Sequence, residues 1–441
     1  RENADFKLAV NLFNDRMYDL AVQQFKQFVS AYPNTAQSIE ARFYLGLVQM
    51  QLKQFDEAKT TFQNFALSYV EHPRASEAWL NVGHAFHALG NEKEAALAYE
   101  RVKVFHPDSP LVPEALLRAG EMRRNLGERD AAKQVLRSLI QGYPDSKQVV
   151  TARLAIGELY AEEGQLELAE EEARRVSRSD APAAVRAAAL FAIAKFQVGA
   201  GLFSNAETTL AGLLGRFAET DVAPIATVEL GKLEVLTGKA KSAAGRLQTM
   251  TGRKGLDDSL KAEALFHLGA AHEGLKQYTL AGDAWDKLIA ATPNHPLGLP
   301  ARLRAAGAAI AEKKFRRAFD LAVRIPADAP ALYRERSLLL SAEASMGLKR
   351  PGEASKYLKL FGNEFPDDPR LTAALFRLGE TYRNELSDCK NALKIYEQIA
   401  EQAPGSVFAD DALFAAAVCQ QTLGNDADAV ATYTDLQTRF P

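Results

Sequence analysis

The residues with the clearest potential for metal chemistry are four histidines in one part of the chain, His72, His84, His87 and His106. His84 and His87 are three residues apart, so on a helix they would share one face and could both bind a metal ion. Neither a cysteine nor a dedicated carboxylate accompanies this pair. We therefore interpret these histidines as polar residues of a helix surface, and we expect no metal ion and no cofactor.

The sequence also lacks the common motifs of enzyme active sites. It contains no G-x-x-x-x-G-K-[ST] phosphate loop, no G-x-S-x-G nucleophile motif and no H-E-x-x-H zinc motif. The protein is therefore predicted not to be an enzyme.

One basic segment, "KKFRR" at 313–317, could bind an anionic partner. Together with neighbouring arginines it would form a basic edge that contacts anionic lipid headgroups or an acidic protein. The alternative is a solvated face, which is the usual role of such runs. The candidate residues of this edge are Arg302, Arg304, Lys313, Lys314, Arg316, Arg317 and Arg324.

The bulk properties describe a soluble folded chain that is too long for one ordinary core. Its 441 residues predict several domains or one repeat array. The formal net charge of −3 does not favour nucleic-acid binding, because such binding draws on a basic excess. No run of eighteen apolar residues exists, so no membrane-spanning helix is expected. The chain begins at Arg1 without a methionine, and we expect that the native N-terminus, with any export signal or lipid anchor, is missing.

Small residues recur through the whole chain with a period of 37 residues, with slips of one or two in the second half. They are Ala9, Gly46, Gly83, Gly120, Gly157, Ala194, Gly231, Gly269, Gly307, Ala342, Gly379 and Ala417. About twelve residues after each comes an alanine, at Ala21, Ala58, Ala95, Ala132, Ala169, Ala206, Ala243, Ala281, Ala318, Ala354, Ala392 and Ala429. This pattern predicts a pair of antiparallel helices that approach closely where a small side chain faces another small side chain.

Large residues and prolines follow the same period. Four residues after each alanine stands a large side chain in ten units, whereas Ala173 and Ala322 break the pattern. Most units end at a proline, and the last of these is Pro441. In 32–46, for example, Tyr-Pro closes one unit, "NTAQS" forms a turn, and "IEARFYLG" is predicted to be the next helix, ending at Gly46.

This register resembles that of the tetratricopeptide repeat (TPR) family in its Gly/Ala, Ala, aromatic and Pro positions. The resemblance implies an all-α, right-handed superhelical solenoid of about twelve 37-residue helix-turn-helix repeats, with 1–441 as a single array. The repeats around 212–258 and 313–330 are expected to be irregular. A 37-residue unit with a Tyr-Pro ending also resembles the TPRs of bacterial envelope proteins, such as outer-membrane-assembly lipoproteins and the periplasmic cell-division coordinator.

In TPR proteins the first helix of each repeat lines a concave groove, and the resemblance implies that residues three before the small position face this groove. Such an apolar ladder suits a peptide with matching anchors, although the same side chains could instead pack between first helices. Charged residues beside the ladder, Glu121, Glu158, Glu343, Glu380, Lys195 and Lys232, could set the register of a partner. The ladder positions are Phe6, Phe43, Leu80, Leu117, Leu154, Phe191, Val228, Phe266, Arg304, Leu339, Phe376 and Phe414.

The resemblance implies a non-enzymatic scaffold that binds one or more proteins in a multiprotein assembly of the cell envelope. The expected compartment is the periplasm or the periplasmic face of the outer membrane. Two alternatives stay open: a cytoplasmic TPR adaptor, or the regulatory arm of an enzyme whose catalytic domain lies outside this chain.

Two cysteines, Cys389 and Cys419, are too few for a disulfide scaffold. Their repeat register makes proximity plausible, and a bond between them would indicate an oxidising compartment. We favour the alternative, two buried thiols that serve as small apolar side chains.

Overall fold

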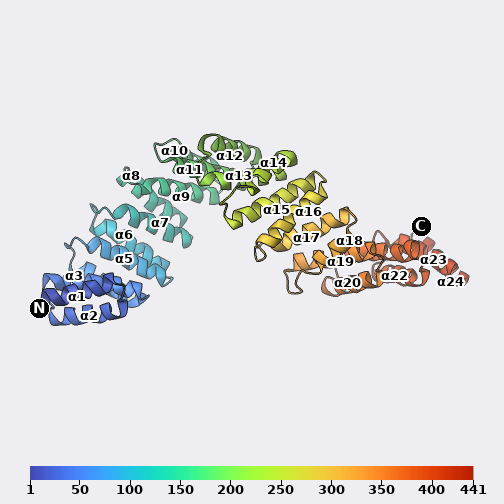
Figure 1. Ribbon diagram of the computed structural model, residues 1–441, viewed down its shortest axis with the longest axis horizontal. Helices are drawn as coiled ribbons and strands as arrows, with labels where there is room; N and C mark the ends of the chain where they lie inside the picture. Colours follow the sequence, from blue (N-terminus) through green and yellow to red (C-terminus); the bar gives the residue numbers. More distant parts are fainter. Residues whose placement is uncertain (441) are drawn as a thin grey trace. The chain divides into compact units, whose positions relative to one another are not determined.

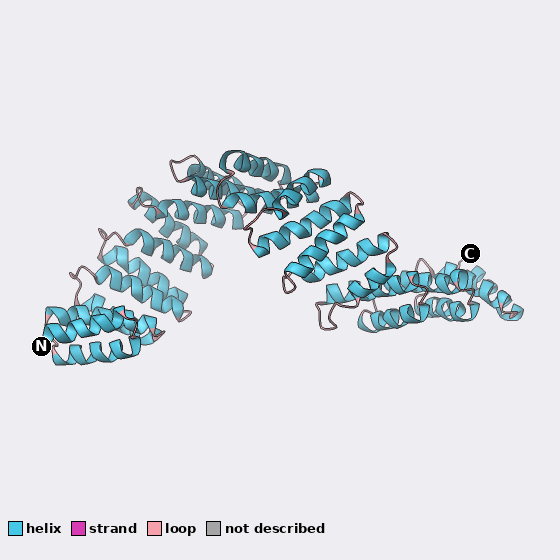
Figure 2. Cartoon of the chain, in the orientation of Figure 1, coloured by secondary structure: helices cyan, strands magenta, loops and turns pink. Residues whose placement is uncertain are grey.

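The computed structural model describes residues 1–440, and these form helices and the turns between them, as Figures 1 and 2 show. The chain divides into two compact units that meet between Val222 and Ala223, inside the segment 212–258 that was predicted to be irregular. Pro441 lies outside the described residues. The all-α prediction is confirmed, while one continuous right-handed array over 1–441 stays a prediction.

The first unit contains six helix pairs. They are α1 (Glu2–Asn14), α2 (Tyr18–Ala31), α3 (Ala36–Gln51), α4 (Phe55–Ser68), α5 (Ala75–Ala88), α6 (Glu92–Phe105), α7 (Val112–Asn125), α8 (Arg129–Gly142), α9 (Gln148–Glu162), α10 (Leu166–Ser177), α11 (Ala183–Gly199) and α12 (Phe203–Phe217).

The second unit continues the same alternation of helix, turn and helix. It contains α13 (Val222–Leu236), α14 (Ala240–Thr251), α15 (Asp258–Gly274), α16 (Tyr278–Ala291), α17 (Gly298–Ala311), α18 (Phe315–Ala322), α19 (Ala331–Gly347), α20 (Pro351–Glu364), α21 (Arg370–Glu380), the π-helix η1 (Thr381–Glu385), α22 (Cys389–Gln402), α23 (Ala409–Thr422) and α24 (Asp426–Arg439).

The start of α3 shows why the predicted boundaries of a first helix need correction. The Thr35 hydroxyl accepts a hydrogen bond from the Ser38 amide at 3.2 Å, which caps the helix and lets it begin at Ala36, inside the predicted turn. The helix then continues to Gln51, five residues beyond Gly46. The small residue therefore lies inside the first helix and does not end it.

The turn between the two helices of each repeat contains one residue with a left-handed backbone. Within residues 1–440 these residues are Arg16, Lys53, Gly90, Gly127, Gly164, Gly201, Gly238, Lys276, Lys313, Lys349, Ser387 and Gly424. Each lies seven residues after the small position predicted for its repeat, except Ser387, which lies eight after Gly379, and Lys313, which lies six after Gly307. Glycine adopts this conformation without a steric penalty, and six of the twelve turns use it.

The small residues of the first helices face large side chains of the second helices. A Cβ atom added at Gly83 would lie 2.3 Å from Tyr99 Cε1, and one added at Gly46 would lie 2.7 Å from Phe62. Gly269 contacts the Trp285 ring in the same way. The prediction that small residues face small residues is therefore wrong at these three positions, where glycine makes room for a ring, whereas at Gly157 the nearest atom is the Ala169 carbonyl oxygen, at 3.0 Å from an added Cβ.

The irregular ninth repeat requires a correction of register by one residue. Lys313 is its left-handed turn residue, so its small position is Ala306, seven residues earlier, and not Gly307. Ala306 is buried, whereas no heavy atom of the described chain outside the neighbouring residues and the helix's own backbone lies within 4 Å of a Cβ atom added at Gly307. The ladder position of this repeat is therefore the buried Leu303 and not Arg304.

The eleventh repeat carries one extra residue between Gly379 and Ala392. The chain accommodates it in η1, where Thr381–Glu385 form a π-helix directly after α21. A π-helix widens the backbone by one residue per turn, so the insertion is absorbed locally and Gly379 still contacts the Tyr396 ring, at 2.5 Å from an added Cβ.

Candidate functional site

The first helices form the inner face of each unit. Successive first helices touch in the pairs α1 and α3, α7 and α9, and α9 and α11 of the first unit, and in α17 and α19, and α19 and α21, of the second. Pairs of successive second helices make less contact within residues 1–440. A stack is narrower on the side where its helices touch, so the first helices line its concave side.

The predicted apolar ladder is largely packed and not open. Phe43 is 0% exposed, Leu80 and Val228 are also buried, and Phe414 is 53% exposed. The other ladder residues, Phe6, Leu117, Leu154, Phe191, Phe266, Leu339 and Phe376, are half-buried. The prediction of an open apolar groove is wrong at Phe43, Leu80 and Val228, because their side chains pack between helices. Partner contact at the remaining positions stays a prediction.

A pocket of about 400 Å³ opens among three successive first helices of the first unit, α7, α9 and α11, together with the turn after α9 and the start of α10. Small residues form much of its wall, which lets another polypeptide approach closely. Arg124 and Glu158 border it on one side and Lys195 on another, and Phe196 contributes apolar surface. Its full lining is Arg124, Glu158, Ala161, Glu162, Gly164, Leu166, Ala192, Lys195, Phe196, Gly199 and Ala200.

The aromatic part of this pocket arises where the repeat pattern breaks. In the fifth repeat Ala173 stands where most repeats have a large residue, so no ring of α10 can cover Gly157. Instead Phe196 of α11 approaches, with Cε2 at 3.4 Å from a Cβ atom added at Gly157. The missing side chain is therefore replaced by one from the next repeat, and this replacement brings Phe196 to the pocket.

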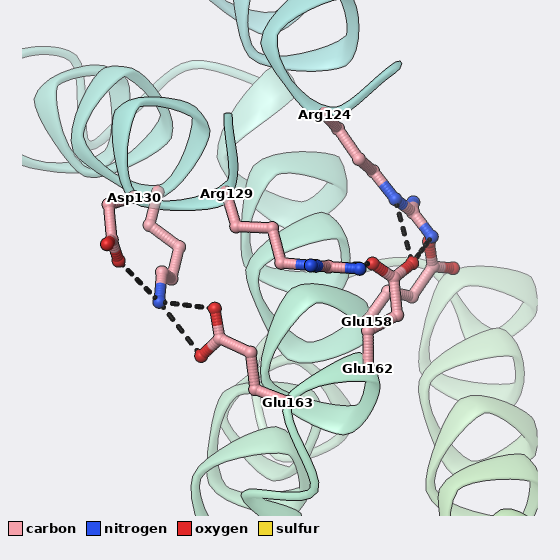
Figure 3. Close-up of polar contacts among 7 residues, drawn as sticks. Arg124, Arg129, Asp130, Glu158, Glu162 and Glu163 are labelled. Carbon is pink, nitrogen blue, oxygen red and sulfur yellow. Dashed lines mark hydrogen bonds and ion pairs between the residues drawn. The ribbon is translucent and has the colours of Figure 1, made fainter. Parts of the chain in front are cut away.

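A network of ion pairs borders the pocket, and Figure 3 shows its side chains. The Arg124 guanidinium donates to Glu158 and, over 2.5 Å, to Glu162 Oε1, and Arg129 Nε lies 3.4 Å from Glu162 Oε2. Arg124 comes from the last turn of α7, where the helix dipole favours a cation. Both glutamates come from α9, so the network joins the fourth repeat to the fifth.

A second group of ion pairs in Figure 3 joins the same two repeats beside this network. Lys133 of α8 is 7% exposed, and its ammonium group lies 2.8 Å from Glu163 Oε1 and 3.0 Å from Asp130 Oδ1. The hydrogen bond to Glu163 raises the pKa of Lys133 although burial opposes it. Lys133 is therefore charged at neutral pH, and its ion pairs hold α8 against the turn that follows α9.

The pKa values of the network keep its groups ionised as well. Burial acts to lower the pKa of Arg124, but its hydrogen bonds to Glu162 and Glu158 outweigh burial and raise that pKa. Burial acts to raise the pKa of Glu162, but Arg124 and Arg129 outweigh it and hold the pKa below its ordinary value. On this side the pocket is therefore bordered by charged groups that are already paired with one another.

Lys195 differs from the other charged residues that were predicted to face a partner. Glu121 pairs with Arg118, Glu158 with Arg124, Glu343 with Arg377, Glu380 with Arg383 and Lys232 with Glu229. Lys195 is exposed, and no carboxylate of residues 1–440 lies within ion-pair distance of its ammonium group. Glu121 and the ladder residues do not line the pocket, whereas Glu158 and Lys195 do.

The structure brings most of the predicted basic edge together. Lys313, Lys314, Arg316, Arg317 and Arg324 line one depression in the second unit. Arg302 lies nearby and donates from Nη1 to the Arg324 carbonyl at 3.2 Å. Arg304 does not line the depression, because it pairs with Glu273 at 2.9 Å and lies over the Phe266 ring.

Of the histidine pair, His84 contributes to a helix contact and His87 is exposed. His84 Nδ1 shares a hydrogen bond of 2.9 Å with the Tyr99 hydroxyl, and burial lowers the pKa of His84. The Tyr99 ring packs against Gly83, so the hydrogen bond from His84 supports the same contact between α5 and α6. No group of three or more His, Cys, Asp or Glu side chains in residues 1–440 is arranged to hold a metal ion.

Cys389 and Cys419 are free thiols that lie in one buried core cluster of α22 and α23. Burial, followed by a hydrogen bond with the Cys389 thiol, raises the pKa of Cys419 to about 12. A thiol with so high a pKa is almost entirely protonated at neutral pH and reacts slowly.

We expect both cysteines to be labelled by N-ethylmaleimide in denaturant without reductant, and both to react slowly in the native protein. Mass spectrometry of the labelled chain would count the reacted thiols. A chain that takes up no label in denaturant would contradict this expectation, because it would show a disulfide.

Comparisons with known proteins agree with this architecture. Two family models, both described as tetratricopeptide repeat, match the chain, one at 45–110 and the other at 3–35, 114–146, 263–295, 373–406 and 411–441. No curated protein sequence matches the chain. In the described residues, no helix is both long enough and apolar enough to cross a membrane.

Solved structures with some similarity include the Naa15/Naa10 complex bound to HypK-THB and MamA. The first match is 14% identical, covers 98% of this chain and 68% of that chain, and has a TM-score of 0.37. The MamA match is 21% identical, covers 37% of this chain and 89% of that chain, and has a TM-score of 0.31. Together with the helix pairs and their period, the matched family models show that the chain belongs to the tetratricopeptide repeat family.

Proposed function

We propose that the protein is a non-enzymatic scaffold that holds a segment of a partner protein in the pocket between α7, α9 and α11. TPR proteins bind other proteins, and this pocket is lined mainly by the C-terminal halves of three successive first helices. The observation that carries the proposal is the exposed, unpaired Lys195 beside the apolar surface of Phe196. A preformed site of this kind costs a partner less ordering free energy than a flexible one.

The chemistry of the pocket favours a particular kind of segment. Ala161, Ala192 and Gly199 leave room for a polypeptide backbone, and Phe196 offers contact to an apolar side chain. Lys195 can bind a carboxylate of the partner, whereas Arg124 is already engaged by two glutamates. The partner segment is therefore expected to carry an apolar side chain next to an acidic one.

We expect Lys195→Glu to remove one partner from the set of proteins that co-purify with the chain, because it places a carboxylate where the partner presents its own. The measurement is quantitative mass spectrometry of proteins captured from the native host. Lys232→Glu is the matched control, since Lys232 has the same repeat position but already pairs with Glu229. Equal sets of captured proteins for the wild type and both variants would contradict the proposal.

We propose further that the assembly belongs to the cell envelope, with the protein in the periplasm or at the periplasmic face of the outer membrane. The 37-residue unit with its Tyr-Pro endings supports this, because it resembles the TPRs of bacterial envelope proteins. Cell fractionation in the native host tests the compartment. Recovery of the protein and its partner in the cytoplasmic fraction would favour the cytoplasmic adaptor, and a captured enzyme domain on the same polypeptide would favour the regulatory arm.

A further inference from the structure

The ninth repeat has a depression of about 780 Å³ on the side of its second helix, between α16, α18 and the turn after α19. Its second helix, α18, has only eight residues, whereas the other second helices of the described chain have at least twelve. Ala322, the last residue of α18, stands where most repeats place a large side chain. The depression belongs to the second unit, whereas the proposed peptide pocket belongs to the first unit.

The depression carries an excess of positive charge. Lys313, Lys314, Arg316, Arg317 and Arg324 line it, together with the carboxylates of Asp286 and Asp320. Arg317 pairs with Asp286 over 2.5 Å, Arg316 with Asp320 over 3.3 Å, and Lys314 with Glu312 over 2.8 Å. Three of the five cations are thus neutralised by the protein itself.

Lys313 and Arg324 are the two cations of the depression that remain without an ion pair. Both are exposed, and no carboxylate of residues 1–440 lies within ion-pair distance of either side chain. The left-handed backbone at Lys313, with φ of 58°, fixes the direction in which this residue leaves the turn. Two cations on the rim are therefore available to anionic groups from outside.

Apolar side chains lie among these charges. Phe315, Leu321 and Leu348 line the depression, and the neighbouring Val323 is 39% exposed. A hollow with an apolar lining and two unpaired cations on its rim is complementary to a segment that carries acidic residues around an apolar anchor.

We propose that this depression, lined by Lys313, Phe315, Leu321, Arg324 and Leu348, docks an acidic segment of a partner protein that inserts an apolar side chain. A bilayer fits it less well, because a flat surface cannot fill a hollow or insert an apolar side chain into it. The surface is a second docking site, in a different unit from the pocket at Lys195.

The test measures binding of a defined peptide to the full chain by fluorescence anisotropy. The probe is a fluorescein-labelled peptide in which aspartates and glutamates flank two Leu-Phe pairs. In one control peptide the acidic residues are replaced by their amides, asparagine and glutamine. In the other, the Leu-Phe pairs are replaced by alanines. We expect the acidic, apolar probe to bind, both control peptides to bind more weakly, and the affinity of the probe to fall as salt is added.

The decisive variant is Lys313→Glu combined with Arg324→Glu, which is expected to lower the affinity of the protein for the probe at least about tenfold. Lys276→Glu is the matched control, because Lys276 has the same left-handed turn position in the preceding repeat and lies outside the depression. The affinity of Lys276→Glu for the probe is expected to equal that of the wild type. Circular dichroism of all variants checks that they are folded.

Three results would overturn the proposal. One is equal binding of the acidic probe and its amide control. A second is binding to vesicles of phosphatidylcholine and phosphatidylserine that the double variant abolishes while the probe stays unbound. The third is self-association in sedimentation that the double variant abolishes, since the occupant would then be a second copy. None of these bears on Lys195→Glu, so the two sites can fail independently.

Discussion

Phe43→Ala is expected to destabilise the protein by roughly 3–5 kcal/mol, because it empties the centre of a packed aromatic cluster. The Phe43 ring is 0% exposed and lies edge-on to Phe62 and Phe65, with ring centroids at 5.2 and 5.3 Å. The Arg74 guanidinium covers its face at 3.9 Å from the centroid. Urea denaturation followed by circular dichroism would measure the loss.

Phe414→Ala provides the matched control, since Phe414 has the same repeat position but is 53% exposed. It packs against Tyr433 alone among the aromatic rings of the described chain, with ring centroids at 6.0 Å. Its removal is expected to cost well under half as much. Similar losses for both variants would show that burial does not distinguish the two positions. A loss of partner binding by Phe43→Ala would therefore report instability and not a groove contact.

Gly83→Ala is expected to cost about 1–3 kcal/mol even though alanine is the better helix former. The added Cβ would lie 2.3 Å from Tyr99 Cε1, which is closer than real side-chain contacts, so the ring or the helix must move. The ring cannot move easily, because its hydroxyl shares a hydrogen bond with His84 and it is buried. The free energy of unfolding in urea is again the measurement.

Gly307→Ala is the same substitution in a first helix with open space around it, and it should stabilise the protein by up to about 1 kcal/mol. No heavy atom of the described chain lies within 4 Å of the added Cβ. Opposite signs for the two variants are expected. A loss at Gly307 as large as that at Gly83 would mean that Gly307, and not Ala306, is the contact residue of the ninth repeat.

The sequence predicted the helix pairs well, because the 37-residue period repeats twelve times and averages out local ambiguity. It did not predict which side chains meet, since a small residue opposite an alanine and a small residue opposite a ring give the same pattern of letters. The ninth repeat was misread for a related reason, because Ala306 and Gly307 are both small. The left-handed turn residue distinguishes the two, because it lies seven positions after the small residue in most repeats. Lys313 therefore identifies Ala306 as the small position.

The candidate site was predicted only in part. Glu158 and Lys195 were among the charged residues proposed for the groove, and Ala173 was recognised as an exception. That Phe196 of the next repeat would fill the space left by Ala173 depends on packing between repeats, which no local pattern encodes. The sequence left open whether the ladder faces a partner or packs between first helices, because position in a repeat gives the direction of a side chain and not the depth to which its neighbours cover it.

The contact between a glycine and a ring also has a consequence for the order in which the chain folds. Gly83 and Tyr99 are sixteen residues apart, as are Gly46 and Phe62, so the main contact of a repeat closes only a short loop. Short loops cost little entropy and form early. A helix pair with such a contact can thus form before its neighbours are in place, whereas the fifth repeat needs Phe196 of the next one. Folding can therefore start at several repeats and spread along the chain.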